Sequence, residues 1–310
     1  VALFDNRVGD YLRPVLHTAH SDQQIFLTSL LTAVLGEGPA AVATALIPDL
    51  HHFRGSFGGA HVIPLWRDAA ATQANITLGL LAFLSECYGQ SVRAEDLFAY
   101  AYALLATPNY VKTFWDELAL PGPRLPLTQD AALFAEGAAL GRRLIWLHTY
   151  GERFVPPGGK PGHIPPGIAR CQIGTPSDPA GYPDRFHYDP ATQELHIGKG
   201  VFAPVRREVW GFSLSGFEVV KSWLAYRMRD RSGKKSSPLD DIRPERWIFD
   251  GELLNLLWVL DHTVDLQPTL AALLEKVLAS ELFTAVELPQ PDEAQRRAIV
   301  EKAEKTELFD

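Results

Sequence analysis

The pattern of apolar and polar positions changes along the chain and divides it into four parts. Residues 1–68 hold short apolar runs at 25–32 and 41–47, and the turn residues Gly and Pro separate them at 36–39. Short apolar runs that end at Gly or Pro are typical of buried strands rather than helices. We therefore expect residues 1–68 to be rich in strands, with a further strand at 61–66.

Residues 69–150 have the longer apolar period of helices. Helices are predicted at 70–88, 91–106, 110–118 and from 130 to about 147, and Gly or Pro interrupts the pattern between them. Ser91 is suited to cap the second helix, and Asp130 to start the fourth, because short polar side chains accept hydrogen bonds from free backbone N–H groups. This part is predicted to be a small helical bundle.

Residues 151–184 form a connector rich in Pro and Gly, and residues 185–310 mix strands with helices. Apolar runs at 186–188 and 194–197, separated by a turn, predict a hairpin. Three helices are expected later, at 243–262, 267–280 and 292–305. The predicted fold class is α+β, with a helical bundle part and a mixed strand-helix part that has a small antiparallel sheet.

The stretch at 205–235 is the one around which the mixed part is organised. Trp210, Phe212 and Leu214 alternate onto one face, as in a strand. Ser215, followed three residues later by Glu218, is a capping box, which predicts that a helix begins directly after that strand. The apolar stripe of this helix is expected to be Phe217, Val220, Leu224 and Met228.

Positive charge is concentrated in the same stretch. The chain has a net charge of −8, but residues 199–246 contain 11 Lys and Arg against 6 Asp and Glu. This asymmetry allows a basic site on an acidic body, as a nucleic-acid-binding protein needs. The alternative is an ordinary amphipathic helix with a solvated basic face. The candidate DNA-binding residues are Arg206, Arg207, Lys221, Arg227, Arg229, Arg231, Lys234 and Lys235.

Few residues of the chain suit a metal or a disulfide framework. Cys87 and Cys171 are the two cysteines, which is typical of cytoplasmic proteins. His51, His52 and His61 have no cysteine and few carboxylates nearby, so we expect no metal there and a tight loop instead. No apolar run approaches the ~18 residues of a membrane helix, and no membrane association is expected.

Catalytic motifs are missing or incomplete. The phosphate-binding loop G-x-x-x-x-G-K-[ST] is absent, which argues against nucleotide hydrolysis. Residues 211–215 read Gly-Phe-Ser-Leu-Ser, close to the nucleophile elbow G-x-S-x-G, so a stand-alone serine hydrolase that uses Ser213 is one alternative. The fifth position is Ser rather than Gly, and Ser215 is better explained as the helix cap. We therefore expect no catalytic residue in this chain.

Several short motifs occur in one order and resemble those of a known family. They read Phe-Ala-Tyr-Ala-Tyr at 98–102, Pro-Asn-Tyr at 108–110, Pro-Arg-Leu-Pro-Leu at 123–127, Leu-Gly at 140–141, Leu-His at 147–148, Val-Trp at 209–210 and Lys-Ser-Trp-Leu at 221–224, with Gly216 and Arg227. In this order they resemble the C-terminal target-recognition part of type ISP restriction-modification enzymes. The resemblance runs from about residue 64 to 291, and residues 4–7 and 48–49 are similar to the trailing edge of the methyltransferase domain.

The resemblance implies a function that the residues alone do not give. Type ISP enzymes are long chains that carry a nuclease, a translocating motor, an adenine methyltransferase and a target-recognition domain. By this resemblance the chain binds double-stranded DNA at a specific sequence, positions the target adenine and licenses cleavage by a nuclease carried elsewhere. Its partners would be DNA and the methyltransferase, motor and nuclease domains of the same polypeptide, in the cytoplasm. S-adenosylmethionine, ATP and Mg are expected only for those domains. A protein-interaction module that does not bind DNA is the remaining alternative.

Overall fold

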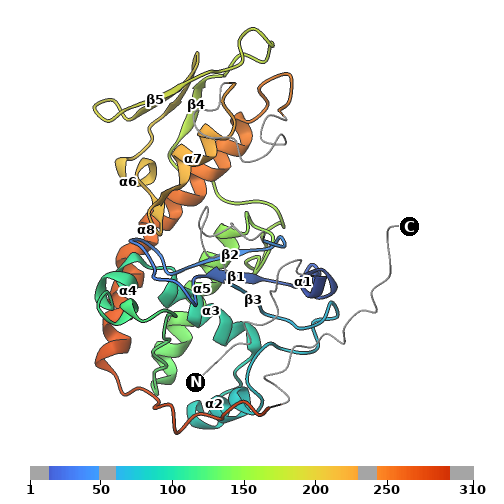
Figure 1. The fold of residues 1–310 in the computed structure, drawn as a ribbon, viewed down its shortest axis with the longest axis vertical. Helices are drawn as coiled ribbons and strands as arrows, with labels where there is room; N and C mark the ends of the chain where they lie inside the picture. The colour runs from blue at the N-terminus through green and yellow to red at the C-terminus, as the bar shows by residue number, and fades with distance from the viewer. Residues whose placement is uncertain (1–13, 49–60, 230–242, 294–310) are drawn as a thin grey trace. The chain divides into compact units, whose positions relative to one another are not determined.

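The computed structural model describes residues 14–48, 61–229 and 243–293 (Figure 1). They form α-helices and small antiparallel sheets, so the predicted α+β class is confirmed. Unit 1 comprises Val1–Pro161 and Pro268–Asp310, and unit 2 comprises Gly162–Gln267. This grouping joins segments that are far apart in sequence, whereas the four parts expected above run along the chain and stay a prediction.

Unit 1 contains the strands expected within residues 1–68. They form one antiparallel sheet of order β2-β1-β3, and β1 is buried at every position. Phe26 of β1 packs with Leu16 and Val62, so apolar side chains cover this face of the sheet. The elements are α1 (Pro14–Thr18), β1 (Phe26–Ser29), β2 (Ala41–Thr44) and β3 (His61–Pro64).

The helical part of unit 1 is confirmed, with corrected boundaries. Its elements are α2 (Leu80–Tyr88), α3 (Ala94–Leu105), α4 (Pro108–Thr113), the 3₁₀ helix η1 (Glu117–Ala119) and α5 (Ala131–His148). Asp130 caps α5 as predicted, since its Oδ1 accepts hydrogen bonds from the N–H groups of Ala132 at 2.8 Å and Leu133 at 3.1 Å. Ser91 does not cap α3, because that helix begins after Arg93, whose N–H donates to Asp96 at 3.0 Å.

Close packing of α3 on α5 depends on Gly141. A Cβ atom at this position would lie 1.8 Å from the carbonyl oxygen of Ala99, so a side chain would force the two backbones apart. Tyr102 of α3 then reaches the sheet, where its hydroxyl accepts a hydrogen bond from the N–H of Ala43 at 3.0 Å. The same hydroxyl lies 2.5 Å from Nδ1 of His148 on α5. Strand β2 is therefore tied to both helices.

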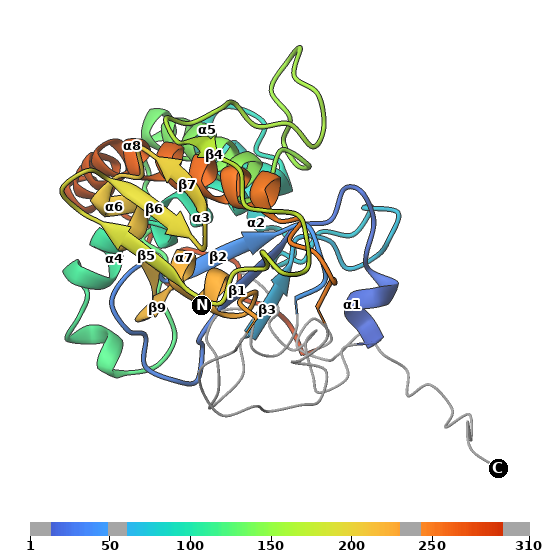
Figure 2. The ribbon, with the colours of Figure 1, turned by 90° about the horizontal axis from the view of Figure 1, so that it is seen from above.

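Unit 2 is a four-stranded antiparallel sheet packed on helices. Its strands are β4 (Arg170–Ile173), β5 (Phe186–Asp189), β6 (Glu194–Ile197) and β7 (Gly200–Ala203), in the order β4-β7-β6-β5. Tyr188, Leu195 and Phe202 lie in one buried cluster with Leu253 and Leu257 of α8 (Asp250–Ala279), so α8 supports the sheet (Figure 1 and Figure 2). The predicted hairpin is confirmed as β5 and β6, and β4 lies within the segment expected to be a connector.

The predicted strand–helix unit at 205–228 is wrong in its first half. The chain forms α6 (Arg207–Trp210), a two-stranded hairpin of β8 (Ser213–Leu214) and β9 (Phe217–Glu218), and then α7 (Val219–Ala225). Ser215 and Gly216 have φ angles of 48° and 81°, which a tight two-residue hairpin turn requires. The expected capping box is therefore absent, and α7 begins after Glu218, whose carboxylate pairs with Lys221 instead.

The apolar stripe and the last helices are partly corrected as well. Val220, Leu224 and Met228 are buried as predicted, whereas Phe217 is exposed. The helices expected at 243–262 and 267–280 are one helix, α8, which continues through Pro268. The helix expected at 292–305 lies almost wholly outside the described residues. Among the residues that the structure describes, no helix is long and apolar enough to cross a membrane.

Candidate nucleic-acid interface

The strand register of unit 2 defines two ends of its sheet. Phe186 pairs with Ile197, which pairs with Gly200, so Arg185 and Lys199 lie at one end. We name it the Tyr182 end and define it by Tyr182, Arg185, Lys199, Arg227, Arg229 and Arg243. The opposite end, where Asp189 pairs with Glu194, is named the Arg206 end and is defined by Asp189, Arg206, Arg207, Glu208, Asp261 and Asp265.

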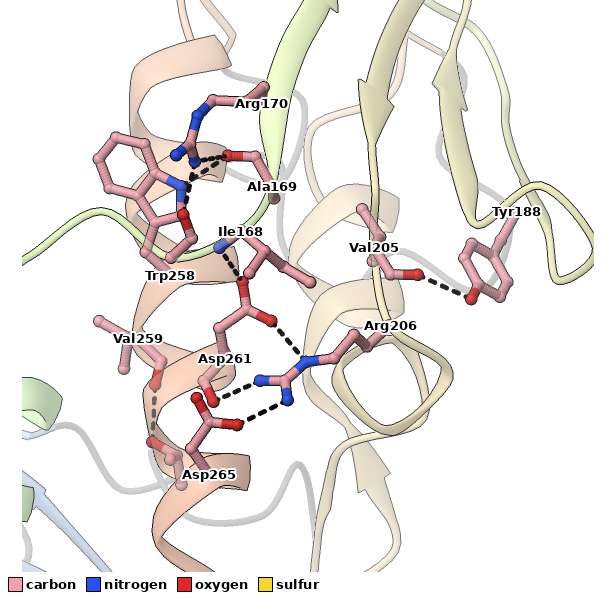
Figure 3. Close-up of polar contacts among 12 residues, drawn as sticks. Ile168, Ala169, Arg170, Tyr188, Val205, Arg206, Trp258, Val259, Asp261 and Asp265 are labelled. Atoms are coloured by element: carbon pink, nitrogen blue, oxygen red, sulfur yellow. Dashed lines mark hydrogen bonds and ion pairs between the residues drawn. The ribbon is translucent and has the colours of Figure 1, made fainter.

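Arg206, a predicted DNA-binding residue, is held by carboxylates of α8 (Figure 3). Its Nε lies 3.0 Å from Asp261 Oδ1 and its Nη1 lies 2.6 Å from Asp265 Oδ1, while Nη2 donates to the carbonyl oxygen of Asp261 at 2.6 Å. The Asp261 side chain is 3% exposed, and its Oδ2 accepts a hydrogen bond from the N–H of Ile168 at 3.0 Å. Arg206 therefore joins the chain after β7 to α8, and its charge is compensated within the fold.

Arg207 and Lys221 are more accessible but are also engaged. Nε and Nη2 of Arg207 donate to the carbonyl oxygen of Pro190 at 3.3 and 3.1 Å. The ammonium group of Lys221 pairs with Glu218 and lies 5.4 Å from the centre of the Trp210 ring. One acidic partner thus offsets the charge of Lys221.

The Tyr182 end gathers arginines through contacts with backbone groups. The Tyr182 hydroxyl donates to the carbonyl oxygen of Arg227 at 3.0 Å, and the N–H of Arg229 donates to Pro183 at 2.9 Å. Nη1 of Arg243 donates to the carbonyl oxygen of Arg229 at 2.8 Å. The first two bonds fix the chain after α7 against the loop that precedes β5, and the third joins Arg243 to the same segment.

The guanidinium groups at this end differ in their surroundings. Arg227 stacks on Trp223 at 3.8 Å, and Glu252 lies 3.6 Å from its Nη2. Nη2 of Arg229 donates to the carbonyl oxygens of Pro179 and Ala180, and the side chain is exposed. Within the part of the chain that the structure describes, Arg229 forms no ion pair. No carboxylate among these residues therefore neutralises the positive charge of Arg229.

The electrostatics around two tyrosines separate the two ends. Burial raises the pKa of Tyr182, and the positive charges of Arg243, Arg227 and Arg229 oppose that rise. Burial also raises the pKa of Tyr188, where the positive charge of Arg207 is opposed by the negative charges of Glu208 and Asp189. The charges that act on Tyr182 are thus all positive, whereas those that act on Tyr188 have both signs.

The predicted residues that the structure describes do not all lie at one end of the sheet. Arg227 and Arg229 lie at the Tyr182 end, Arg206 and Arg207 lie at the other, and Arg231, Lys234 and Lys235 are outside the described residues. Arg185 and Lys199 were not among the predicted residues, although the predicted hairpin places both at the same end of the sheet. Arg243 was not predicted either, since only folding brings it to Arg229.

The other candidate sites receive no support. Ser213 lies in β8 and pairs across the hairpin with Glu218, so the helix that must follow a nucleophile elbow is missing. His51 and His52 are outside the described residues, and Nδ1 of His61 accepts a hydrogen bond from Leu31 at 3.3 Å. The described residues contain no group of three or more His, Cys, Asp and Glu that could hold a metal ion.

Comparison with known proteins identifies a family. A family model described as the type ISP C-terminal specificity domain matches residues 1–257. No curated protein matches the sequence.

Three similar solved structures share the fold at low identity. The cryo-EM structure of a DrdV–DNA complex has 18% identity and a TM-score of 0.54, over 81% of this chain and 24% of that chain. The ATP-dependent type ISP restriction-modification enzyme LlaBIII bound to DNA has 15% identity and a TM-score of 0.54, over 84% and 16%. A nuclease-deletion mutant of the type ISP enzyme LlaGI with a DNA substrate mimic has 16% identity and a TM-score of 0.50, over 84% and 22%.

The chain spans less than a quarter of the length of these larger proteins. The similarity to solved structures therefore supports the fold. The family model covers most of this chain and shows the family to which it belongs. The chain belongs to the type ISP C-terminal specificity domain family.

Proposed function

We propose that this chain recognises a specific double-stranded DNA sequence as the specificity part of a type ISP-like restriction-modification enzyme. The observation that carries this proposal is the family match over residues 1–257. The solved structures with the same fold are described as DNA complexes, which supports DNA as the ligand. In such a complex, Lys and Arg hold phosphates, while Arg, Asn or Gln side chains read base edges in a groove.

Other domains of the same polypeptide would carry out the chemistry. The similar chains are at least four times longer than the segment that this chain matches, which leaves room for a methyltransferase, a motor and a nuclease. This chain would position a target adenine for the methyltransferase and license cleavage by the nuclease. S-adenosylmethionine, ATP and Mg would bind those domains, and the complete enzyme would act in the cytoplasm.

The two alternatives have no comparable support. A serine hydrolase needs Ser213 on a sharp strand-to-helix turn, and the hairpin at this position does not provide one. A hydrolase of this kind would lose its ester hydrolysis on Ser213→Ala. We expect the chain to show only background hydrolysis, with or without this substitution. No observation favours a protein-interaction module over a DNA-binding domain.

Selection from a randomised duplex library tests the proposal. The full chain is incubated with the library at low salt, bound duplexes are recovered, and their sequences are compared with the input. We expect one short sequence to be enriched, with each mismatched base pair costing about 1–3 kcal/mol of binding free energy. Binding without any enriched sequence, or no binding at all, would contradict specific recognition by this chain.

A further inference from the structure

We infer that the Tyr182 end of unit 2 contacts the phosphate backbone of DNA and that the Arg206 end does not. This inference rests on the proposed function and goes further, because it assigns the contact to one of two groups of basic residues. It adds Arg185 and Lys199 to the binding surface and removes Arg206 and Arg207 from it.

Free charge at the Tyr182 end is the first argument. A guanidinium group has five N–H donors, and in the described part of the chain Arg229 uses only Nη2 of its side chain, on two carbonyl oxygens. A carbonyl oxygen orients the guanidinium without neutralising it. Donors on Nε and Nη1 of Arg229 therefore remain for a phosphate, which prefers such charged donors.

The second argument is that the surrounding backbone is fixed. The N–H of Arg229 is bonded to Pro183, and a Cβ atom at Gly198 would lie 3.1 Å from Pro183, so the β6–β7 turn packs on the same loop. Arg185 and Lys199 extend from the ends of these strands and are exposed. Three exposed cations are thus held on one rigid frame, which reduces the ordering cost of binding.

Carboxylates at the Tyr182 end do not cancel this charge. Asp178 and Asp184 are exposed in the same loop, and Asp178 accepts a hydrogen bond from the N–H of Gly181 at 2.7 Å. Within the described residues, neither forms an ion pair with Arg185, Lys199 or Arg229. At the Arg206 end, by contrast, two carboxylates bind Arg206 directly, and the negative charges of Glu208 and Asp189 oppose the charge of Arg207.

Salt titration of duplex binding tests the inference in the full chain. The test variants are Arg229→Ala and the double variant Arg185→Ala with Lys199→Ala. Arg207→Ala is the matched control, because Arg207 is also an exposed arginine whose partner is a proline carbonyl oxygen. Each lost phosphate contact should reduce the slope of log affinity against log salt by about 0.9.

We expect the double variant to lose about 1.8 of this slope and to bind all duplexes more weakly, with Arg207→Ala unchanged. Circular dichroism checks that each variant is folded. If Arg229→Ala does not fold, the double variant still tests the inference, because Arg185 and Lys199 are both exposed. If the unmodified chain binds DNA and the double variant keeps its slope, or Arg207→Ala loses as much, the inference is wrong and the proposed function stands. If the unmodified chain binds no duplex, the proposed function itself fails.

Discussion

A fall in pH should destabilise unit 1 through His148. The Tyr102 hydroxyl lies 2.5 Å from His148 Nδ1 and accepts a hydrogen bond from Ala43 on β2. Burial raises the pKa of Tyr102, so the hydroxyl keeps its proton and donates it to the imidazole. Nδ1 can accept only in the neutral ring, and protonation of His148 would break this link between the sheet and both helices.

The magnitude follows from the pKa of His148. Burial lowers this pKa from 6.5 to about 4. Between about pH 6.5 and pH 4, His148 is protonated in the unfolded chain but neutral in the folded chain. The contribution of His148 to the free energy of unfolding is therefore fully present above pH 6.5 and decreases as the pH falls to about 4. The difference between these two pKa values corresponds to about 3 kcal/mol of unfolding free energy. This value is an upper limit, because the His148 side chain keeps some contact with solvent.

Urea unfolding followed by fluorescence, at several pH values between about 7 and 4, measures this loss against His148→Gln. Glutamine does not titrate, and its side-chain oxygen can still accept from Tyr102. Carboxylates titrate in both proteins, so their contribution cancels in the difference. We expect the unmodified chain to lose up to about 3 kcal/mol relative to the variant across this range. An NMR titration that gives His148 a pKa near 6.5, or a difference that does not change with pH, would refute the reasoning.

Four further substitutions have outcomes set by the packing. Arg206→Ala should lower the free energy of unfolding by about 3 kcal/mol, because it leaves the buried carboxylate of Asp261 without its charged partner; chemical denaturation measures this. Gly141→Ala should lower the free energy of unfolding by about 3 kcal/mol or prevent folding. Gly251→Ala, at an exposed position of α8 where a Cβ atom meets nothing within 4 Å, should be neutral or stabilise by up to about 1 kcal/mol in the same assay. Ser215→Gly should raise the melting temperature slightly, since the φ of 48° costs a non-glycine residue about 1 kcal/mol; a lower value would show that the lost side chain matters more.

Local signals in the sequence were sufficient for part of the fold. Asp130 was predicted as a cap and is one, since capping involves only the next three residues. The hairpin of β5 and β6 was predicted because alternating residues flank a turn. Both features depend on neighbours in the chain, which a sequence displays directly.

The prediction failed where two local signals compete. Ser215 and Glu218 have the spacing of a capping box, while Ser215-Gly216 is also suited to a two-residue hairpin turn. The structure forms the turn, which lets β8 pair with β9 before α7 starts. Pro268 misled in a similar way, since it suggests a helix end and yet lies within α8, between the buried Leu266 and Leu270. Tertiary packing decided both outcomes.

The candidate site shows most clearly what sequence reasoning could not give. A count of Lys and Arg treats Arg206 and Arg229 alike, but the availability of each depends on acidic groups that lie far away in the sequence. Asp261, the partner of Arg206, is 55 residues further along the chain. No pattern near Arg206 indicates that contact, because it arises from the passage of α8 under the sheet.

The net charge of −8 bears on how DNA can approach this chain. Most of an acidic surface repels a duplex, so binding needs a region where positive charge is both concentrated and uncompensated. Arg206 is paired with two carboxylates, so it holds the fold together but adds little to the external potential. Arg229, Arg185 and Lys199 are exposed and form no ion pair within the described residues. If the Tyr182 end contacts the phosphates as inferred, repulsion elsewhere restricts the productive orientations to those in which this end faces the duplex, which positions the chain without reading the sequence.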